Sequence, residues 1–109
     1  MSDWKTAPEI DEAILNTLVS AVGAEAFSAM KVQFIEDLKS LHLAYQAASD
    51  AQNESAARET AHALKGAASN IGLARLGALA ASLEHGQVEN ASELEPVFSS
   101  ALNRLNEVA

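Results

Sequence analysis

Apolar residues recur along most of the chain at steps of three and four, which is the spacing of one face of an α-helix. The longest such run predicts a helix over about 24–49. Its apolar stripe advances by steps of 3, 4, 4, 3 and 4 through Phe27, Met30, Phe34, Leu38, Leu41 and Tyr45. A polar break over 50–53 follows it. A stripe sustained over this length is typical of a helix that buries one face in a core.

Four shorter helices are predicted around it, over about 9–22, 53–70, 74–85 and 92–108. The first has apolar residues at a spacing of four, and the last two show inward-facing apolar stripes. The inward positions predicted for these three helices are Ile10, Ile14, Leu18 and Val22, then Leu76, Leu79, Ala80 and Leu83, then Leu94, Val97, Phe98, Ala101, Leu105 and Val108.

The predicted helix ends coincide with residues that suit them chemically. Pro8 suits a helix start, because proline has no N–H group to leave unpaired there. Asn53 can cap the helix over 53–70, and Ser92 with Glu95 has the spacing of a capping box. Glycine commonly ends helices because it adopts a positive φ without strain. Glycines at the predicted ends are Gly23, Gly72 and Gly86.

Long amphipathic helices joined by short links pack antiparallel to one another. The chain is therefore predicted to be all-α and a single domain over 1–109. The four helices after residue 23 are expected to form an antiparallel four-helix bundle, with the short extra N-terminal helix at one end. Residues 1–7 are interpreted as an extended arm, in which Trp4 either folds back as a hydrophobic plug, the favoured interpretation, or is disordered.

Composition supports this class and excludes several kinds of site. The 109 residues have the length of one domain, and only 5 Gly and 2 Pro are available for the turns of an all-β fold. Hydrophobic residues make up 49% but aromatic residues only 5%, so most of the apolar mass is aliphatic and helix-forming. The absence of cysteine excludes disulfides, thiolate metal sites and cysteine nucleophiles.

The charge balance bears on partners and location. Seven Lys and Arg against fifteen Asp and Glu give a net charge of −8. Nucleic acids and anionic membranes both attract clustered cations, so neither is expected as a partner. No apolar run approaches the roughly 18–20 residues that span a bilayer, and the first residues lack a signal-peptide pattern. We therefore expect an acidic, soluble, cytoplasmic protein.

Candidate chemistry lies in the predicted helix over 53–70. On a wheel of about 100° per residue, its core face consists of Ala57, Ala61, Leu64, Ala68 and Ile71. His62 points away from that face, and Arg58, Lys65 and Ser69 lie within about 60° of it. This placement argues against a buried structural histidine and leaves either a solvated surface histidine or a reactive one.

The neighbours of His62 favour the reactive interpretation. Gly66 in mid-helix costs about 1 kcal/mol relative to alanine, and its small size would let another macromolecule approach the imidazole. Lys65 can reach an anion attached to the ring, and Ser69 can donate a hydrogen bond to it. Because imidazole is a competent nucleophile near neutral pH, this set is suited to accept a phosphoryl group and pass it on.

The string from His62 to Gly72, HALKGAASNIG, resembles the signature of histidine-containing phosphotransfer (HPt) domains. That signature is a histidine, two residues, Lys-Gly, and a run of small residues ending in an apolar residue and glycine. The resemblance implies a phosphoryl carrier in a two-component phosphorelay, with no kinase activity of its own. It implies response-regulator receiver domains or a hybrid histidine kinase, or both, as partners.

The resemblance also implies roles for the matching residues. His62 is the expected phospho-accepting residue, with Nε2 as the site. Lys65 would position and neutralise the phosphoryl group, Ser69 would contact the phosphate or the partner, and Gly72 would mark the bend between paired helices. The expected partner interface consists of Arg58, Glu59, Ala63, Gly66, Ala67 and Asn70. Serine is common in the family where Ala67 stands, which puts one hydroxyl contact in doubt. No cofactor of its own is expected, because the partner receiver domain supplies Mg²⁺.

The remaining titratable residues are expected to be ordinary. His42 lies off the stripe of its helix and is interpreted as a surface or boundary residue. His85 lies in a last helical turn, where the helix dipole favours a cation. The three histidines lack ligand spacing, so no metal site is expected. The acidic pairs at 11–12 and 36–37 diverge on their helices and are interpreted as solvated faces.

Two other function classes remain open alongside the carrier. The first is a non-catalytic helical adaptor that docks receiver domains without phosphotransfer, which the intact His-Lys-Gly set disfavours. The second is a hydrolase that uses His62 as a general base. Neither a serine nor a carboxylate can be tied to His62 from the sequence, and a convex helix face offers no substrate pocket. No glycine-rich phosphate loop is present, so no ATP site is expected.

Overall fold

The computed structural model describes residues 4–107, and the described chain consists of helices and their connections. In chain order the elements are the 3₁₀ helix η1 (Trp4–Thr6), α1 (Glu12–Val22), α2 (Ala24–Asp50), α3 (Glu54–Asn70), α4 (Ala74–Glu84), the 3₁₀ helix η2 (Val88–Glu93) and α5 (Leu94–Glu107). The predicted all-α class is confirmed, and helix bounds differ from the predicted ones by three residues at most.

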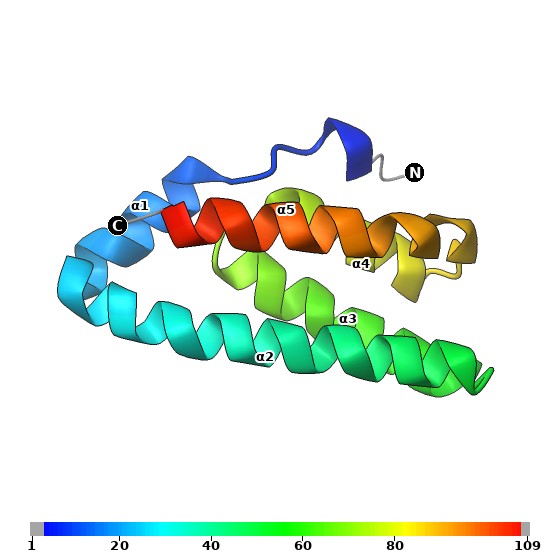
Figure 1. Ribbon diagram of the computed structural model, residues 1–109. Helices are drawn as coiled ribbons and strands as arrows, with labels where there is room; N and C mark the ends of the chain where they lie inside the picture. The colour runs from blue at the N-terminus through cyan, green and yellow to red at the C-terminus, as the bar shows by residue number, and fades with distance from the viewer. Residues whose placement is uncertain (1–3, 108–109) are drawn as a thin grey trace.

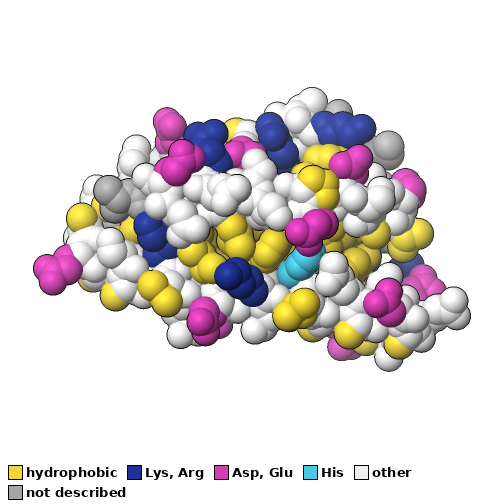
Figure 2. Space-filling view, viewed as in Figure 1, with side chains coloured by type: hydrophobic (Ala, Val, Ile, Leu, Met, Phe, Trp, Pro, Cys, Tyr) yellow, Lys and Arg dark blue, Asp and Glu magenta, His cyan; other side chains and the backbone are white. Residues whose placement is uncertain are grey.

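The helices α2 to α5 form the bundle, and α1 turns across one end of it (Figure 1). The helix α3 packs extensively against both α2 and α4, whereas α5 packs on α4 and only sparsely on α2. In Figure 2, which shows the face of α2 and α5, apolar side chains are visible in the seam between these two helices. Leucines make up about half of the buried core, and most of them are at most 2% exposed, among them Leu38, Leu64, Leu73, Leu76, Leu79, Leu83 and Leu105.

Among the described residues, no single helix is long and apolar enough to span a membrane. Within residues 4–107, the pair α1 and α2 reaches that length and composition when taken together, but the two helices are bent by 119° relative to each other.

The first helix starts later than predicted. Its N-cap is Asp11, whose carboxylate accepts hydrogen bonds from the backbone N–H groups of Ala13 (3.1 Å) and Ile14 (3.3 Å). The prediction of a start at Pro8 was therefore wrong. The physical reason is that a carboxylate satisfies free N–H groups at a helix start, whereas proline only avoids adding one.

The buried face of α1 also differs from the predicted one. Leu15 is 3% exposed, whereas Ile14 and Val22, both predicted to be inward, are 40% and 37% exposed. A step of four residues overshoots a helical turn by about 40°. A stripe spaced by fours therefore drifts off any one face, and the packed face of α1 is set by Leu15, Leu18 and Val19.

The N-terminal segment packs against the bundle. Trp4 is 8% exposed, and η1 contacts α4. This confirms the hydrophobic plug, but Trp4–Thr6 form a 3₁₀ turn and not the predicted extended arm. The rest of that arm includes residues 1–3, which lie outside the described residues. The Nε–H of Arg75 on α4 donates a hydrogen bond to the Ala7 carbonyl (3.0 Å) and fixes the segment further.

Glu9 joins this segment to two helices of the bundle. Its Oε2 accepts a hydrogen bond from the Ser100 hydroxyl (2.5 Å), and its Oε1 lies 3.5 Å from Arg104 Nη1. Arg75 Nη1 lies 3.9 Å from Glu9 Oε2. The carboxylate is thus a common acceptor for side chains of α4 and α5.

The last helix starts at Leu94, and the predicted capping box is wrong. Ser92 lies within η2, which runs directly into α5, and the Leu94 N–H bonds the Ala91 carbonyl. A preceding 3₁₀ turn supplies carbonyl acceptors to the first N–H groups of the helix, so no side-chain cap is needed. The predicted stripe is buried at Leu94, Phe98, Ala101 and Leu105, while Val108 lies outside the described residues.

Gly72 fixes the turn between α3 and α4, as predicted. Its φ is +82°, and a Cβ at this position would lie 2.9 Å from the Asp11 carbonyl oxygen. The Gly72 carbonyl accepts a hydrogen bond from the Asp11 N–H (2.7 Å). Glycine is required here both for the positive φ and for the close approach of the start of α1.

Candidate functional site

The helix α3 presents His62 to solvent because its opposite face is buried. Asn53 caps the helix as predicted, and its side chain accepts a hydrogen bond from the Ala56 N–H (3.1 Å). Ala61, Leu64 and Ala68 have no exposed surface, whereas the side chain of His62 is 66% exposed. The prediction that His62 points away from the buried face of this helix is therefore confirmed, and the imidazole is accessible to another molecule.

The carboxylate of Glu84, on α4, lies within hydrogen-bond distance of the His62 imidazole. Glu84 Oε2 lies 2.7 Å from His62 Nδ1, and Glu84 Oε1 lies 3.0 Å from Lys65 Nζ. The Glu84 side chain is 23% exposed and that of Lys65 is 35% exposed, so both lie lower in the surface than the imidazole. One carboxylate thus links the two residues that the sequence predicted to act together.

The electrostatic environment keeps Glu84 ionised. The nearby Lys65 ammonium, followed by the hydrogen bond from His62, lowers the pKa of Glu84 below its ordinary value. An ionised carboxylate only accepts hydrogen bonds. The Glu84–His62 contact therefore requires a proton on Nδ1, and in the neutral ring this leaves the lone pair on Nε2.

Two glycines shape the surface around this group. A Cβ added at Gly66 would meet no atom within 4 Å, so the space beside His62 is open as predicted. At Gly77 on α4, an added Cβ would lie 2.5 Å from Ser69 Oγ. Gly77 therefore allows α4 to lie close against α3 at Ser69.

The comparisons with known proteins identify the family of this chain and its fold. A family model for the Hpt domain matches residues 12–108. The chain belongs to the Hpt family. Its fold is similar to that in the crystal structure of histidine-containing phosphotransfer protein B (HptB) from Pseudomonas aeruginosa PAO1, with a TM-score of 0.80 and 24% sequence identity over 94% of this chain and 95% of that one. A search of curated proteins found no match.

Membership places the chain in a family of phosphotransfer carriers, which are generally not enzymes. Hpt proteins interact with receiver domains and histidine kinases in two-component systems. The expected resemblance to this family and its phosphorelay context is thus confirmed at the level of the family.

The residues predicted to form the Hpt partner interface spread along α3 on both sides of His62. Arg58 and Glu59 line a shallow hollow of about 370 Å³ together with His62 and Glu84. Arg58 also pairs with Glu54 one turn earlier, with an N–O distance of 3.1 Å.

Towards the C-terminal end of α3, Ala63 and Asn70 are exposed and Ala67 is half-buried. Asn70 also lines a largely apolar hollow of about 450 Å³ beside α1. The structure therefore brings Arg58 and Glu59 together at His62, whereas Asn70 lies two helical turns away.

Glu84 is the site residue that the sequence analysis missed. It lies 22 residues from His62, on another helix. An antiparallel hairpin pairs positions that are equally distant from its turn, and His62 and Glu84 are each 11 residues from Leu73. Ser69 and Gly77 are each four residues from Leu73, so both contacts follow one register. Counted from the predicted turn at Gly72, the same symmetry would pair His62 with Ser82, so Glu84 is identified only once the packed hairpin places the centre at Leu73.

His42 is buried, and its interpretation as a surface or boundary residue was wrong. It is 6% exposed and stacks on Phe98 of α5, with ring centroids 4.4 Å apart. Its Nε2 lies 3.4 Å from Glu95 Oε2. Burial lowers the pKa of His42, and the Glu95 carboxylate opposes that shift only in part. The physical reason for the error is that α2 contacts both α3 and α5, so its buried face is wider than one stripe.

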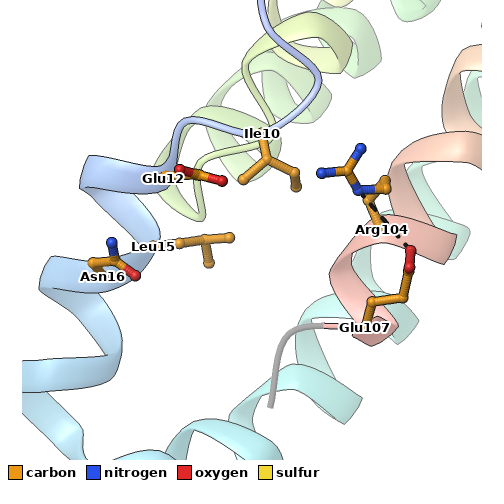
Figure 3. A pocket seen from close by; sticks show the side chains of 6 residues that line it. All are labelled: Ile10, Glu12, Leu15, Asn16, Arg104 and Glu107. Carbon is orange, nitrogen blue, oxygen red and sulfur yellow. Dashed lines mark ion pairs between the residues drawn. The ribbon is translucent and has the colours of Figure 1, made fainter.

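His85 and the acidic residues form no second site within the described chain. His85 is exposed at the C-cap of α4, as predicted from the helix dipole. Among residues 4–107, no group of three or more His, Asp or Glu side chains could hold a metal ion. The hollow between α1 and α5, of about 590 Å³, is lined by Ile10, Glu12, Leu15, Asn16, Arg104 and Glu107 (Figure 3). None of the predicted site residues lies in it.

Proposed function

We propose that this protein carries a phosphoryl group on His62 Nε2 and passes it between kinase and receiver domains of a two-component phosphorelay. The observation that favours this most is an imidazole that is 66% exposed and whose Nδ1 lies 2.7 Å from Glu84 Oε2. Family membership supports the same class of chemistry.

The transfer would begin with a phosphorylated aspartate of a docked receiver domain. The lone pair of His62 Nε2 attacks phosphorus in line, a new N–P bond forms, and the P–O bond to the aspartate breaks. The electron pair of that bond remains on the released carboxylate. The same step run backwards passes the group to another receiver.

Lys65 is suited to balance the charge that arrives with the phosphoryl group. Its ammonium is held near the ring through Glu84 and retains partial exposure (35%). Charge-assisted hydrogen bonds to phosphate oxygens are among the stronger polar contacts in proteins. We assign Lys65 the role of neutralising the group on the imidazole.

The interface roles follow from position along α3. Gly66 leaves open space one turn from His62, where a partner would approach. Ser69 is seven residues from His62, which is about 10 Å along the helix axis. We therefore favour contact of Ser69 with the docked partner over contact with the phosphoryl group. The interface would continue through Arg58 and Glu59 on the other side of His62.

The partner would complete the reaction centre. A receiver domain supplies the aspartate and the Mg²⁺ that neutralises its phosphate, so no cofactor is needed on this chain. We propose that the protein acts in the cytoplasm as a single Hpt domain over 1–109, with receiver domains or a hybrid histidine kinase as partners.

The test is to incubate the purified protein with radiolabelled phosphorylated kinases and receivers and to follow the label. We expect acid-labile, base-stable phosphate on the wild type and none on His62→Gln. His85→Gln removes another exposed histidine and should still accept the label. Binding of a receiver without any label on His62 would support the adaptor function instead, and label retained on His62→Gln would overturn the assignment.

A further inference from the structure

The helix α2 turns one side away from the core along a long edge of the bundle (Figure 1). Phe27 and Tyr45 on this helix are buried. Glu36 is nine residues from each of them, or two and a half turns, so it lies on the opposite side of the helix. Val32 and Leu43 share that outward side, and they are 62% and 63% exposed.

The outward side carries apolar and charged residues in one stripe. Four exposed residues follow one another at steps of four, three and four, namely Val32, Glu36, Lys39 and Leu43. Within residues 4–107, neither Glu36 nor Lys39 forms an ion pair. Single exposed apolar residues are ordinary on a protein surface. Steps of three and four along one exposed face are instead the spacing of a seam between two packed helices.

This stripe is complementary to itself when one copy is reversed. Val32 and Leu43 are equally far from the midpoint of the stripe, and so are Glu36 and Lys39. An antiparallel pair of α2 helices with a two-fold axis at this midpoint therefore places Val32 of one copy opposite Leu43 of the other. It also places Glu36 opposite Lys39, and the axis repeats both contacts. A parallel pair would place like charges opposite each other in both central layers.

We infer that the outward face of α2 is the interface of an antiparallel two-fold dimer, and that its partner is a second copy of this chain. The complementary charges favour this occupant, because the chain itself supplies both members of each pair. Charged residues at the centre of a helical seam fix its register and orientation at some cost in stability. The interface goes beyond the proposed function and does not depend on it.

The chemistry of the next layers limits the interface. The outermost neutral layer would place Ala29 opposite Gln46, and both are exposed. The layer beyond it would place Glu25 opposite Asp50, where like charges repel. The contact therefore covers residues 29–46, which is about 26 Å of helix. A contact of this size is typical of weak and reversible association.

The net charge of the chain sets the conditions under which the dimer is expected. Each copy has a net charge of −8, so two copies repel each other at long range. At about 0.15 M salt, charges more than about 8 Å apart are largely screened from each other. Glu36 and Lys39 of opposite copies would be in contact, and they keep their attraction. We therefore expect the dimer at physiological ionic strength.

The dimer leaves the site at His62 open in both copies. His62 lines its hollow together with Arg58 and Glu59 of α3 and Glu84 of α4, and no residue of α2 lines this hollow. A second copy on the outward face of α2 therefore covers none of these residues. The proposed dimer would present two exposed imidazoles, one on each copy.

Sedimentation velocity from about 1 µM to about 1 mM in about 0.15 M salt measures the association. The wild type should shift from monomer to dimer over this range. Leu43→Ser should weaken the dimer by at least about 100-fold, because two leucine side chains lose their burial. Val88→Ser is the matched control, since it removes an equally exposed apolar side chain (64%) outside α2 and should change nothing. Circular dichroism checks that each variant is folded.

Charge reversal tests the pairing directly. In a dimer of Glu36→Lys four cations meet at the centre, and in a dimer of Lys39→Glu four anions meet there. Each variant should therefore remain monomeric where the wild type is dimeric. Glu36→Lys lowers the net negative charge and Lys39→Glu raises it, so a general charge effect would move the two in opposite directions. An equimolar mixture of the two should form the dimer again.

Crosslinking tests the orientation, and the chain has no cysteine to interfere with it. The outer neutral layer supplies the positions Ala29→Cys and Gln46→Cys. A short bismaleimide should join these two variants when they are mixed. It should not join two copies of Ala29→Cys, because these cysteines would be about 26 Å apart along the paired helices.

Three results would overturn the proposal. They are a wild type that stays monomeric up to about 1 mM, a dimer that is equally stable in Glu36→Lys, and a crosslink between two copies of Ala29→Cys. The first would leave this face of α2 to solvent or to a different protein.

Phosphoryl loading is measured separately with phosphoramidate, a small donor whose P–N bond breaks as ammonia leaves. Leu43→Ser should load at the wild-type rate, and a loss of loading would contradict the separation of the two surfaces. Sedimentation requires no phosphate on His62, so failure of the proposed function would leave the dimer proposal standing.

Discussion

Replacing Gly66 with alanine should make the protein more stable and slower in transfer. The glycine lies in the middle of α3, and an added Cβ would meet no atom within 4 Å. Alanine at a mid-helix position is favoured over glycine by about 1 kcal/mol. Because nothing in the folded chain opposes the methyl group, nearly all of this gain should appear in the free energy of unfolding.

That gain is large enough to measure. About 1 kcal/mol raises the melting temperature of a domain of this size by roughly 4–8 °C. Thermal unfolding followed by circular dichroism, with the fluorescence of the buried Trp4 as a second probe, gives the value. Gly77→Ala is the matched control, because its Cβ would lie 2.5 Å from Ser69 Oγ, and this clash should outweigh the gain and lower the stability.

The rate of phosphoryl transfer from a receiver should fall in Gly66→Ala, and it should fall further when the side chain at this position is larger. A Gly66→Leu side chain would hold a docked receiver away from His62, and a displacement of about 1 Å can slow a reaction about 100-fold. Loading from phosphoramidate, which is too small to be obstructed, should stay within a factor of two or so of wild type. An unaltered rate from a phosphorylated receiver, or a destabilised Gly66→Ala protein, would refute this reasoning.

Two further predictions concern stability. Gly77→Ala should lower the free energy of unfolding in the wild-type background but raise it by about 1 kcal/mol in a Ser69→Ala background, because removal of the Ser69 hydroxyl makes room for the methyl group. A double-mutant cycle measured by urea unfolding tests this, and additive effects of the two substitutions would contradict the contact. Burial lowers the pKa of His42 in the folded state, so the unfolded chain binds the proton more tightly and stability should fall as the pH drops below about 6.5. Replacing His42 with phenylalanine keeps a ring against Phe98 and should remove that part of the pH dependence; identical pH profiles of the two proteins would show that His42 does not contribute.

The α3 helix was predictable because one strong pattern determined it. Its small and apolar residues form a single buried face, and Asn53 and Gly72 mark its limits with groups that cap or turn a helix. The orientation of His62 followed directly from this pattern. The reactive group and its solvent exposure could therefore be predicted from one segment of sequence.

The misplaced residues depend on contacts between elements. His42 lies beside Leu41 on α2, and a wheel of α2 alone cannot show that α5 covers it with Phe98. Ser92 has a capping sequence, but the preceding segment forms its own 3₁₀ turns and supplies backbone acceptors instead. Local preference is a weak guide where a neighbouring element competes for the same groups.

Glu84 is a site residue that could not be predicted for the same reason, since its position depends on contacts between helices. Nothing in the sequence near Glu84 indicates reactivity, because its role arises from the register of α3 against α4. That register depends on the turn at Gly72, whose lack of a side chain lets the start of α1 pack on it. The nucleophile was thus visible in sequence, while the group that orients it required the packed hairpin.

The central claim is that His62 Nε2 is the atom that carries the phosphoryl group. The most direct measurement is heteronuclear NMR of the phosphorylated protein, in which coupling between phosphorus-31 and the imidazole nitrogens identifies the bonded atom. The account predicts coupling to Nε2 of His62 and its loss in His62→Gln. Phosphorus on Nδ1, on His85 or on any other residue would contradict it.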